Sequence, residues 1–217
     1  GKYISENTDI KVVFNGDGSD EQSGYKYLRN APNDIEFHKE CIKRVRNLHY
    51  FDCLRANKST MAWGLEVRVP FLDKQFLETA VPIKRDFKLD RIEKHVLRKA
   101  FDLYDAEGKP EFLPKSVLWR QKEQFSDGVG YNWVNTLIED TESKISDEEF
   151  SQVNDSYKVN PPKTKEALFY RKIFDSIFPK CENTVEKWIP NTDWSGVKAD
   201  PSGRAQQVHT SVDSNFQ

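Results

Sequence analysis

The stretch from Lys11 to Glu21, K-V-V-F-N-G-D-G-S-D-E, constrains the fold more than any other part of the sequence. Together with Ile10, the residues Val12–Phe14 form an apolar, β-branched run that is typical of a buried parallel strand. The run stops at Asn15–Ser19, where two glycines allow backbone angles that side chains would forbid. We therefore predict a strand that enters a tight turn.

The turn itself has two interpretations. Successive backbone N–H groups in such a turn form a concavity that suits phosphate oxygens. Asp20 and Glu21 follow at once, and a divalent cation can bridge carboxylates and phosphates. The same residues also fit an ordinary strand-to-helix turn with a solvated acidic edge, because short glycine patterns often occur by chance. The spacing alone leaves both interpretations open.

Composition excludes several classes of protein. The chain has 217 residues, of which 37% are hydrophobic and 31% are charged, as in one globular domain or slightly more. No apolar run approaches the ~20 residues that cross a bilayer. A net charge of −2 gives no general attraction for nucleic acid. The three cysteines form no C-x-x-C pair, which favours a reducing, cytoplasmic location with the cysteines as small core residues.

Helices dominate the remaining pattern. Only Ile10–Phe14 clearly predicts a strand, and the alternation over Leu65–Val69 permits a second. Because a central strand needs neighbours on both edges, we expect the rest of the sheet upstream of this chain. The predicted fold is α/β and predominantly helical, with a domain over 1–179 and an irregular C-terminal tail over 180–217. Trp188 and Trp194 are candidates for attaching this tail to the domain.

The predicted helical segments are 25–31, 35–56, 74–80, 92–104, 115–119, 131–145 and 164–178.

The long helix expected from Ile35 to about Ala56 has an apolar side that becomes ionic toward its end. Continued at helical spacing, that side reaches Asp52 and then Arg55. A buried charge is costly unless it pairs with another charge or with a ligand. The two residues are therefore predicted either to form a structural ion pair or to meet a charged ligand. The apolar residues that define this side are Ile35, Ile42, Val45 and Leu48.

A charged segment without apolar periodicity, Arg120–Gly130, is predicted to be a loop. Loops that carry Arg and Lys between packed helices often meet anionic ligands. A solvated surface loop is the alternative, because charged residues are mostly exposed.

Taken together, these segments resemble the C-terminal part of the synthetase domain of glutamine-dependent asparagine synthetases. The resemblance runs from about Lys11 to His209. Several landmarks that occur in order are far more specific than the glycine turn alone. They are Gly16–Glu21, Asp52–Asn57, Arg68–Asp73, Trp119–Gly130 and Asp200–Ala205.

The resemblance implies a fold and a reaction. The fold would be the C-terminal portion of an ATP pyrophosphatase domain, which is of the adenine-nucleotide alpha-hydrolase type. Aspartate would attack the α-phosphorus of ATP to give β-aspartyl-AMP and pyrophosphate, and ammonia from glutamine would then displace AMP. The cofactors would be ATP and Mg²⁺, with an N-terminal glutaminase domain as the ammonia source and a possible homodimer in the whole enzyme. No nucleic acid or membrane partner is expected.

The resemblance also implies roles for individual residues. Asp20 would hold Mg²⁺ together with an upstream acid, and Lys122 would face the pyrophosphate as a point charge. Asp17, Lys122 and Arg55 would act in catalysis. The expected nucleotide contacts are Asn15, Gly16, Gly18 and Ser19. The expected substrate contacts are Asp52, Arg55, Arg68 and Glu21, with Arg68 equally suited to a supporting position outside the pocket.

The chain departs from the family pattern at Asp17, where the family has a glutamate. A carboxylate drawn back by about 1.5 Å can lose ~10²-fold in rate if nothing else shifts. The family's Ser-Gly-Gly-x-Asp-Ser phosphate loop and its N-terminal cysteine nucleophile do not occur, and the chain starts at Gly1. We therefore expect a truncated or processed chain that cannot hydrolyse glutamine and that, alone, barely binds ATP.

Two alternatives to asparagine synthesis stay open. One is a related synthetase that adenylates another carboxylate, as β-lactam synthetases do. The other is a non-catalytic, nucleotide-binding remnant. The ionic residues Asp52, Arg55 and Lys122 favour asparagine synthesis, whereas Asp17 and the missing phosphate loop favour the remnant.

Overall fold

The computed structural model describes residues 1–120, 122 and 131–196. The chain divides into two compact units. The first unit comprises Gly1–Gln121 and Lys187–Gln217, and the second comprises Lys122–Glu186. The landmark Asp200–Ala205 and most of the predicted loop Arg120–Gly130 lie outside the described residues.

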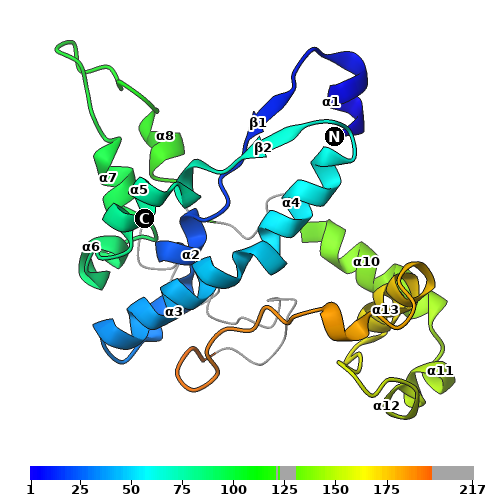
Figure 1. Ribbon diagram of the computed structural model, residues 1–217. Helices are drawn as coiled ribbons and strands as arrows, with labels where there is room; N and C mark the ends of the chain where they lie inside the picture. The colour runs from blue at the N-terminus through cyan, green and yellow to red at the C-terminus, as the bar shows by residue number, and fades with distance from the viewer. Residues whose placement is uncertain (121, 123–130, 197–217) are drawn as a thin grey trace. The chain divides into compact units, whose positions relative to one another are not determined.

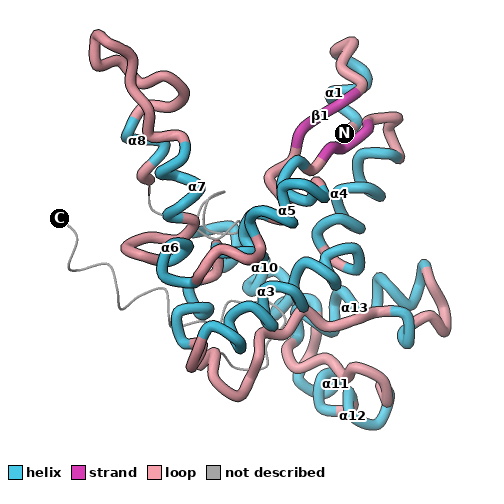
Figure 2. Tube along the Cα trace, turned by 60° about the vertical axis from the view of Figure 1, so that its left-hand side comes forward, coloured by secondary structure: helices cyan, strands magenta, loops and turns pink. Residues whose placement is uncertain are grey.

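The first unit contains a short parallel sheet of two strands (Figures 1 and 2). Strand β1 (Val12–Phe14) pairs with β2 (Glu66–Arg68), so that Val12 lies opposite Glu66 and Phe14 lies opposite Arg68. The amide of Asn15 donates to the carbonyl of Arg68 at 2.9 Å, which continues the ladder past the end of β1. The structure confirms the strand predicted within Ile10–Phe14 and the second strand that the alternation over Leu65–Val69 permits, and it pairs the two with each other.

Helices and turns connect and follow the strands, because parallel strands cannot be joined by a tight hairpin. Helix α1 (Lys2–Asn7) precedes β1. The crossover from β1 to β2 contains α2 (Ser19–Ser23), the 3₁₀ turn η1 (Lys26–Asn30), α3 (Asp34–Asn47), the 3₁₀ turn η2 (Leu48–Tyr50) and α4 (Asp52–Met61). The elements after β2 are the 3₁₀ turn η3 (Pro70–Leu72), α5 (Lys74–Ala80), α6 (Arg85–Leu89), α7 (His95–Ala100) and α8 (Lys115–Leu118).

The second unit is helical in the residues that the structure describes. Ile145, Val153 and Leu168 form its buried cluster, with Phe150 and Phe169 packed against them. The side chain of Thr164 caps its last long helix by accepting from the amide of Ala167 at 3.1 Å. Its elements are α10 (Tyr131–Lys144), α11 (Asp147–Ser151), α12 (Val153–Ser156), α13 (Lys165–Ile177) and the 3₁₀ turn η4 (Glu182–Thr184).

The prediction of one continuous helix over 35–56 is wrong. On its predicted apolar side Leu48 is buried, but Ile35 and Ile42 are exposed. Phe51, at φ −125° and ψ −104°, interrupts the helical backbone between η2 and α4. The side of α3 that packs inward carries Phe37, Glu40, Cys41 and Arg44, while Ile35 is 67% exposed. Glu40 and Arg44 can be buried because Arg44 Nε lies 2.9 Å from Glu40 Oε1, and a paired charge costs much less to bury than an isolated one.

The helix predicted over 92–104 is also shorter than expected. Helix α7 begins at His95, because Lys94 has a left-handed backbone with φ +62° and cannot belong to a right-handed helix. By contrast, the predicted start of α5 is confirmed. Asp73 Oδ1 accepts from the amides of Gln75 and Phe76 at 2.9 and 3.2 Å.

The core of the first unit lies between η1, α3 and α6. Its buried residues are Tyr27, Leu28, Ala31, Phe37, Cys41 and Leu89. Trp194 packs against this cluster, and Asn30 Nδ2 donates to the carbonyl of Ser195 at 2.7 Å. The expectation that tryptophans of the tail attach it to the domain is therefore confirmed for 187–196.

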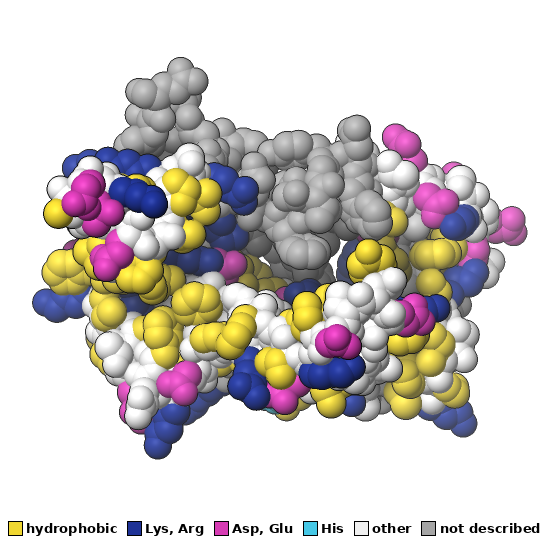
Figure 3. All heavy atoms as spheres, turned by 90° about the horizontal axis from the view of Figure 1, so that it is seen from above, with side chains coloured by type: hydrophobic (Ala, Val, Ile, Leu, Met, Phe, Trp, Pro, Cys, Tyr) yellow, Lys and Arg dark blue, Asp and Glu magenta, His cyan; other side chains and the backbone are white. Residues whose placement is uncertain are grey.

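Many large apolar side chains remain exposed in the described residues. Phe14 is 76% exposed and Val12 is 37% exposed, so the prediction of a buried strand is wrong for this chain. The physical reason is that the described residues place no layer over these side chains. Figure 3 shows hydrophobic side chains on the surface of one face. No helix among the described residues is long and apolar enough to cross a membrane.

The corrected face of α3 predicts opposite results for two neighbouring substitutions. Phe37→Ala should lower the free energy of unfolding by about 3–5 kcal/mol, because it opens a cavity in the core. Ile35→Ala, at an exposed position two residues earlier, should change it by no more than about 0.5 kcal/mol. Urea unfolding followed by circular dichroism measures both. Similar losses at the two positions would contradict the assigned face.

Candidate functional site

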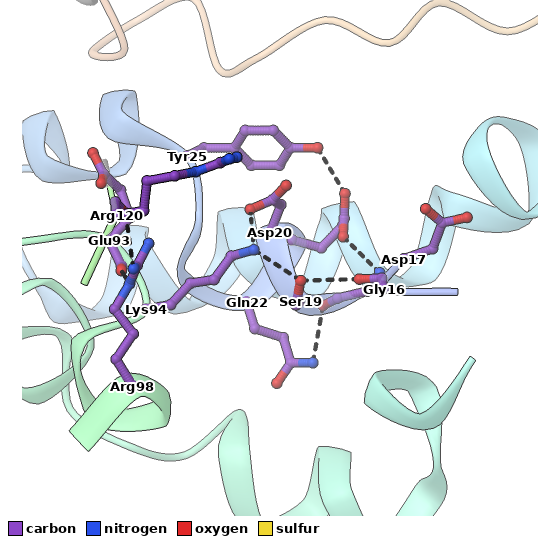
Figure 4. Close-up of polar contacts among 12 residues, drawn as sticks. Gly16, Asp17, Ser19, Asp20, Gln22, Tyr25, Glu93, Lys94, Arg98 and Arg120 are labelled. Atoms are coloured by element: carbon purple, nitrogen blue, oxygen red, sulfur yellow. Dashed lines mark hydrogen bonds and ion pairs between the residues drawn. The ribbon is translucent and has the colours of Figure 1, made fainter. Parts of the chain in front are cut away.

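The turn after β1 is built by hydrogen bonds between its own residues (Figure 4). Asn15 Oδ1 accepts from the amide of Asp17 at 3.1 Å, and Asn15 Nδ2 donates to Asp17 Oδ2 at 2.9 Å. The amide of Gly18 donates to Glu21 Oε2 at 3.0 Å, and the amide of Ser19 donates to the carbonyl of Gly16 at 3.4 Å. The amides of residues 17–19 are thus used within the turn, as in the ordinary strand-to-helix turn that the spacing left open beside a phosphate-binding concavity.

Only one of the two turn glycines needs to be glycine for conformational reasons. Gly18 has φ +96°, and a Cβ there would lie 2.4 Å from Leu72 Cδ2. Gly16 does not have a positive φ, and a Cβ there would meet nothing within 4 Å. The prediction that both glycines supply unusual backbone angles is therefore wrong for Gly16.

A side-chain amide joins the loops that follow the two strands. Gln22 Nε2 donates to the carbonyl of Gly18 at 3.0 Å and to the carbonyl of Phe71 at 2.9 Å. These loops lie at the carboxyl ends of parallel strands, which is where open α/β sheets bind ligands. The candidate site is therefore centred on this edge of the sheet.

Lys94 is a member of the site that sequence reasoning missed. Its Nζ lies 2.7 Å from Asp20 Oδ1 and donates to Ser19 Oγ at 2.9 Å. Figure 4 shows Lys94 reaching the turn from one side, with Asp17 at the other end. Its backbone amide also donates to the carbonyl of Ser23 at 3.2 Å. No spacing in the sequence indicates this contact, because Lys94 falls inside a predicted helix and is 74 residues away from Asp20 in the printed sequence.

Asp17, Asp52 and Arg55 are close enough for their charges to act on one another. Asp52 opens α4 and forms an i, i+3 ion pair with Arg55, whose side chain is 65% exposed. Burial raises the pKa of Asp17, and the nearby Asp52 carboxylate raises it further. The Arg55 guanidinium and the hydrogen bond from Asn15 lower this pKa in part, while Asp20 adds a smaller upward effect. The structure thus brings these predicted residues together around one carboxyl group.

Glu21 has a structural task in this turn. Its side chain is only 3% exposed. One carboxylate oxygen caps the turn at Gly18, and the other accepts from the hydroxyl of Tyr25 at 2.6 Å. Burial raises the pKa of Glu21, and the hydrogen bond from Tyr25 opposes that effect. Both oxygens are therefore engaged by the protein itself.

Arg68 and Lys122, two of the predicted site residues, are not part of the group formed by Asp17, Asp52 and Arg55. Arg68 Nε lies 2.7 Å from Glu66 Oε1, and both side chains are more than half exposed. Lys122 belongs to the second unit. The chain that leads to Lys122 is held by Arg98 of α7, which donates to the carbonyls of Leu118 and Arg120 at 2.6 and 2.9 Å.

Asp20 is the residue of this site that the sequence assigned to Mg²⁺. No group of three or more His, Cys, Asp or Glu residues that could hold one occurs in the part of the chain that the structure describes. Mg²⁺ is often bound by one or two carboxylates together with substrate phosphates and water. Asp20 fits the part of one such carboxylate, provided that its contact with Lys94 gives way.

Substituting the two partners of the Asp52–Arg55 pair should move the pKa of Asp17 in opposite directions. Asp52→Asn removes a negative charge that disfavours ionisation of Asp17, so the pKa should fall. Arg55→Gln removes a positive charge that favours ionisation, so the pKa should rise. The titration of the Asp17 carboxyl carbon by ¹³C NMR measures both shifts.

Lys58 provides a matched control on the same helix. It is exposed and is not among the groups that act on Asp17, so Lys58→Gln should leave the titration unchanged. Shifts of the same sign for Asp52→Asn and Arg55→Gln, or an equal shift for Lys58→Gln, would contradict the electrostatic grouping.

Comparison with known proteins places this chain in a family. The family model described as asparagine synthase matches residues 29–198. The chain is 53% identical over 213 residues to a probable glutamine-hydrolyzing asparagine synthetase of Dictyostelium discoideum, covering 94% of this chain and 37% of that protein. It is 51% identical over 208 residues to the glutamine-hydrolyzing asparagine synthetase 1 of Saccharomyces cerevisiae, covering 92% of this chain and 36% of that protein. The chain thus spans little more than a third of the length of these relatives. It belongs to the asparagine synthase family.

Proposed function

We propose that this chain is part of an enzyme that converts aspartate to asparagine, using ATP and ammonia released from glutamine. The single observation that carries the proposal is the grouping of Asp17, Asp52 and Arg55 beside the turn after β1, in a chain of this family. The names of the relatives support asparagine synthesis over ring closure of the β-lactam synthetase kind.

Arg55 and Asp52 would select the substrate. Aspartate carries two carboxylates and an amino group, and a guanidinium binds a carboxylate through two parallel hydrogen bonds. The exposed side chain of Arg55 is open to such a ligand, while Asp52 holds it by an ion pair. The Asp52 carboxylate would attract the amino group of the substrate. Arg68 would take a supporting position, because it pairs with Glu66.

Asp17 would handle the proton of the incoming ammonia. The amide-forming step needs a base, because ammonia loses a proton as the C–N bond forms. A carboxyl group whose pKa is raised by burial is a better base than one in water. The asparagine synthetase resemblance expects a glutamate here, so Asp17 would have to work from a position about one methylene further back.

The charges around Asp20 would receive the phosphates of ATP. Asp20 would hold Mg²⁺, which when bound neutralises phosphate charge, together with an acid from outside this chain. Once its contact with Asp20 is broken, Lys94 would act as a second cation for the phosphates. This role would be in addition to the pyrophosphate contact proposed for Lys122. Charge builds on the leaving pyrophosphate, so prearranged cations lower that barrier most. The proposed nucleotide contacts remain Asn15, Gly16, Gly18 and Ser19, with Glu21 maintaining the turn.

The remaining proposals concern the whole protein. A glutaminase domain would supply ammonia, the ATP pyrophosphatase fold would be completed by further strands, and the whole enzyme could form a homodimer. A cytoplasmic location agrees with Cys41, Cys53 and Cys181, all of which are free thiols in the structure. The boundary predicted near 179 also stays a prediction.

The products formed from ATP test the proposed function. The whole protein that carries this chain should release AMP and pyrophosphate from labelled ATP only when aspartate is present. Arg55→Ala should lower kcat/KM for aspartate roughly 10- to 100-fold, because it removes a charged hydrogen-bond donor. Lys58→Ala, on the same helix, should change it by less than about twofold. Release of ADP, or AMP release that does not depend on aspartate, would reject the proposal.

A further inference from the structure

A cavity of about 360 Å³ lies in the first unit, and no residue of the turn after β1 lines it. One wall comes from the C-terminal half of α3 and from Phe51, and the other comes from 187–193. Its volume is near the lower end of the range for small-molecule pockets, ~300–1,000 Å³. None of the residues assigned to aspartate or ATP lines it, so it needs a separate explanation.

Arg44 is a buried cation that lines this cavity and has unused hydrogen-bonding capacity. Its side chain is 2% exposed. Nε donates to Glu40 Oε1 and to the hydroxyl of Tyr27, each at 2.9 Å. Nη2 is buried and has no hydrogen-bond partner among the described residues. A buried charged donor without an acceptor is costly, and such rare groups call for an explanation.

The protein holds the guanidinium firmly in place. Its central carbon lies 4.2 Å from the centroid of the Trp188 ring. Glu40 Oε1 also accepts from the hydroxyl of Tyr27 at 3.0 Å and from the amide of Asn191 at 3.3 Å. These contacts fix the Arg44 fork between α3 and the segment 187–193. They leave the cavity wall with a rigid donor rather than a flexible one.

The charge around the cavity favours an anion. Lys43 and Lys187 line it together with Arg44, and Asp193 is the carboxylate among the lining residues. Glu40 lies behind Arg44 and compensates one cation. Counting these five groups leaves a surplus of one positive charge. A guanidinium fork matches the paired oxygens of a carboxylate or phosphate.

The cavity also has an aromatic wall. Phe51 and Trp188 both line it, with their ring centroids 4.8 Å apart and their planes inclined by 63°. Aromatic side chains pack against apolar parts of a ligand. A free inorganic ion would leave this wall unused.

We propose that this cavity binds a small organic anion, which places a carboxylate or phosphate group toward Arg44 and an apolar body against Trp188 or Phe51. Lys43 and Lys187 add attraction at the rim. The site would be additional to the one for aspartate and ATP. Occupation would fasten the segment 187–193 to α3, because residues of both walls would contact the same ligand.

Titration of the 217-residue chain with four probes tests the proposal. The probes are phenyl phosphate, benzoate, inorganic phosphate and phenol. Calorimetry gives the affinity, and the indole N–H signal of Trp188, assigned by its loss in Trp188→Phe, reports the place of binding by NMR. Phenyl phosphate or benzoate should bind saturably and shift this signal, and the stronger of the two identifies the anionic group. Phenol should not bind, and inorganic phosphate should bind at least about tenfold more weakly than the better aromatic anion.

Matched substitutions locate the site without removing the buried ion pair. Lys187→Gln should weaken binding about 3- to 10-fold, because it removes a cation at the rim. Arg46→Gln removes an exposed cation of α3 that does not line the cavity, and should change binding by less than twofold. The proposal is overturned if neither aromatic anion binds saturably, if phenol binds equally well, if inorganic phosphate matches the better aromatic anion, or if both substitutions weaken binding equally.

Discussion

The parallel pairing of β1 with β2 determines where the charged groups of the candidate site can lie. The bond from the Asn15 amide to the Arg68 carbonyl extends the ladder to the start of the turn, and Gln22 then joins the turn to the loop after β2. With that edge fixed, the break at Phe51 allows α4 to begin separately, with Asp52 and Arg55 in its first turn. The charges meet beside one strand end although they come from distant parts of the crossover.

The site separates groups that maintain its shape from groups left for chemistry. Glu21 uses both carboxylate oxygens within the protein, and the turn amides of residues 17–19 are likewise engaged. Arg55 is exposed, and Asp17 keeps a raised pKa through burial. Asp20 and Lys94 form a pair that phosphate and a cation would have to separate. Binding of the nucleotide would thus exchange an internal ion pair for contacts with the ligand.

Local patterns in the sequence predicted part of this arrangement. The run Ile10–Phe14 and the cap at Asp73 are encoded by neighbouring residues, and both were predicted. The buried face of α3 was not, because paired Glu40 and Arg44 replace the apolar residues that periodicity looks for. Lys94 was missed because its place depends on a left-handed backbone and on a contact far along the chain. Helical spacing grouped Asp52 with Arg55 and left open an ion pair or a ligand site, and the structure shows the ion pair. The family resemblance implied that both residues lie near the substrate.

A double-substitution cycle between Asp17 and Arg55 in the whole protein tests the central claim most directly. The claim is that these residues act on the same aspartate molecule rather than separately. Each single variant, Asp17→Asn and Arg55→Gln, lowers kcat/KM for aspartate by some factor. We predict that the loss in the double variant is smaller than the product of these two factors by at least about tenfold. The reason is that groups that act as a unit are strongly non-additive. Effects that multiply to within about twofold would contradict the claim.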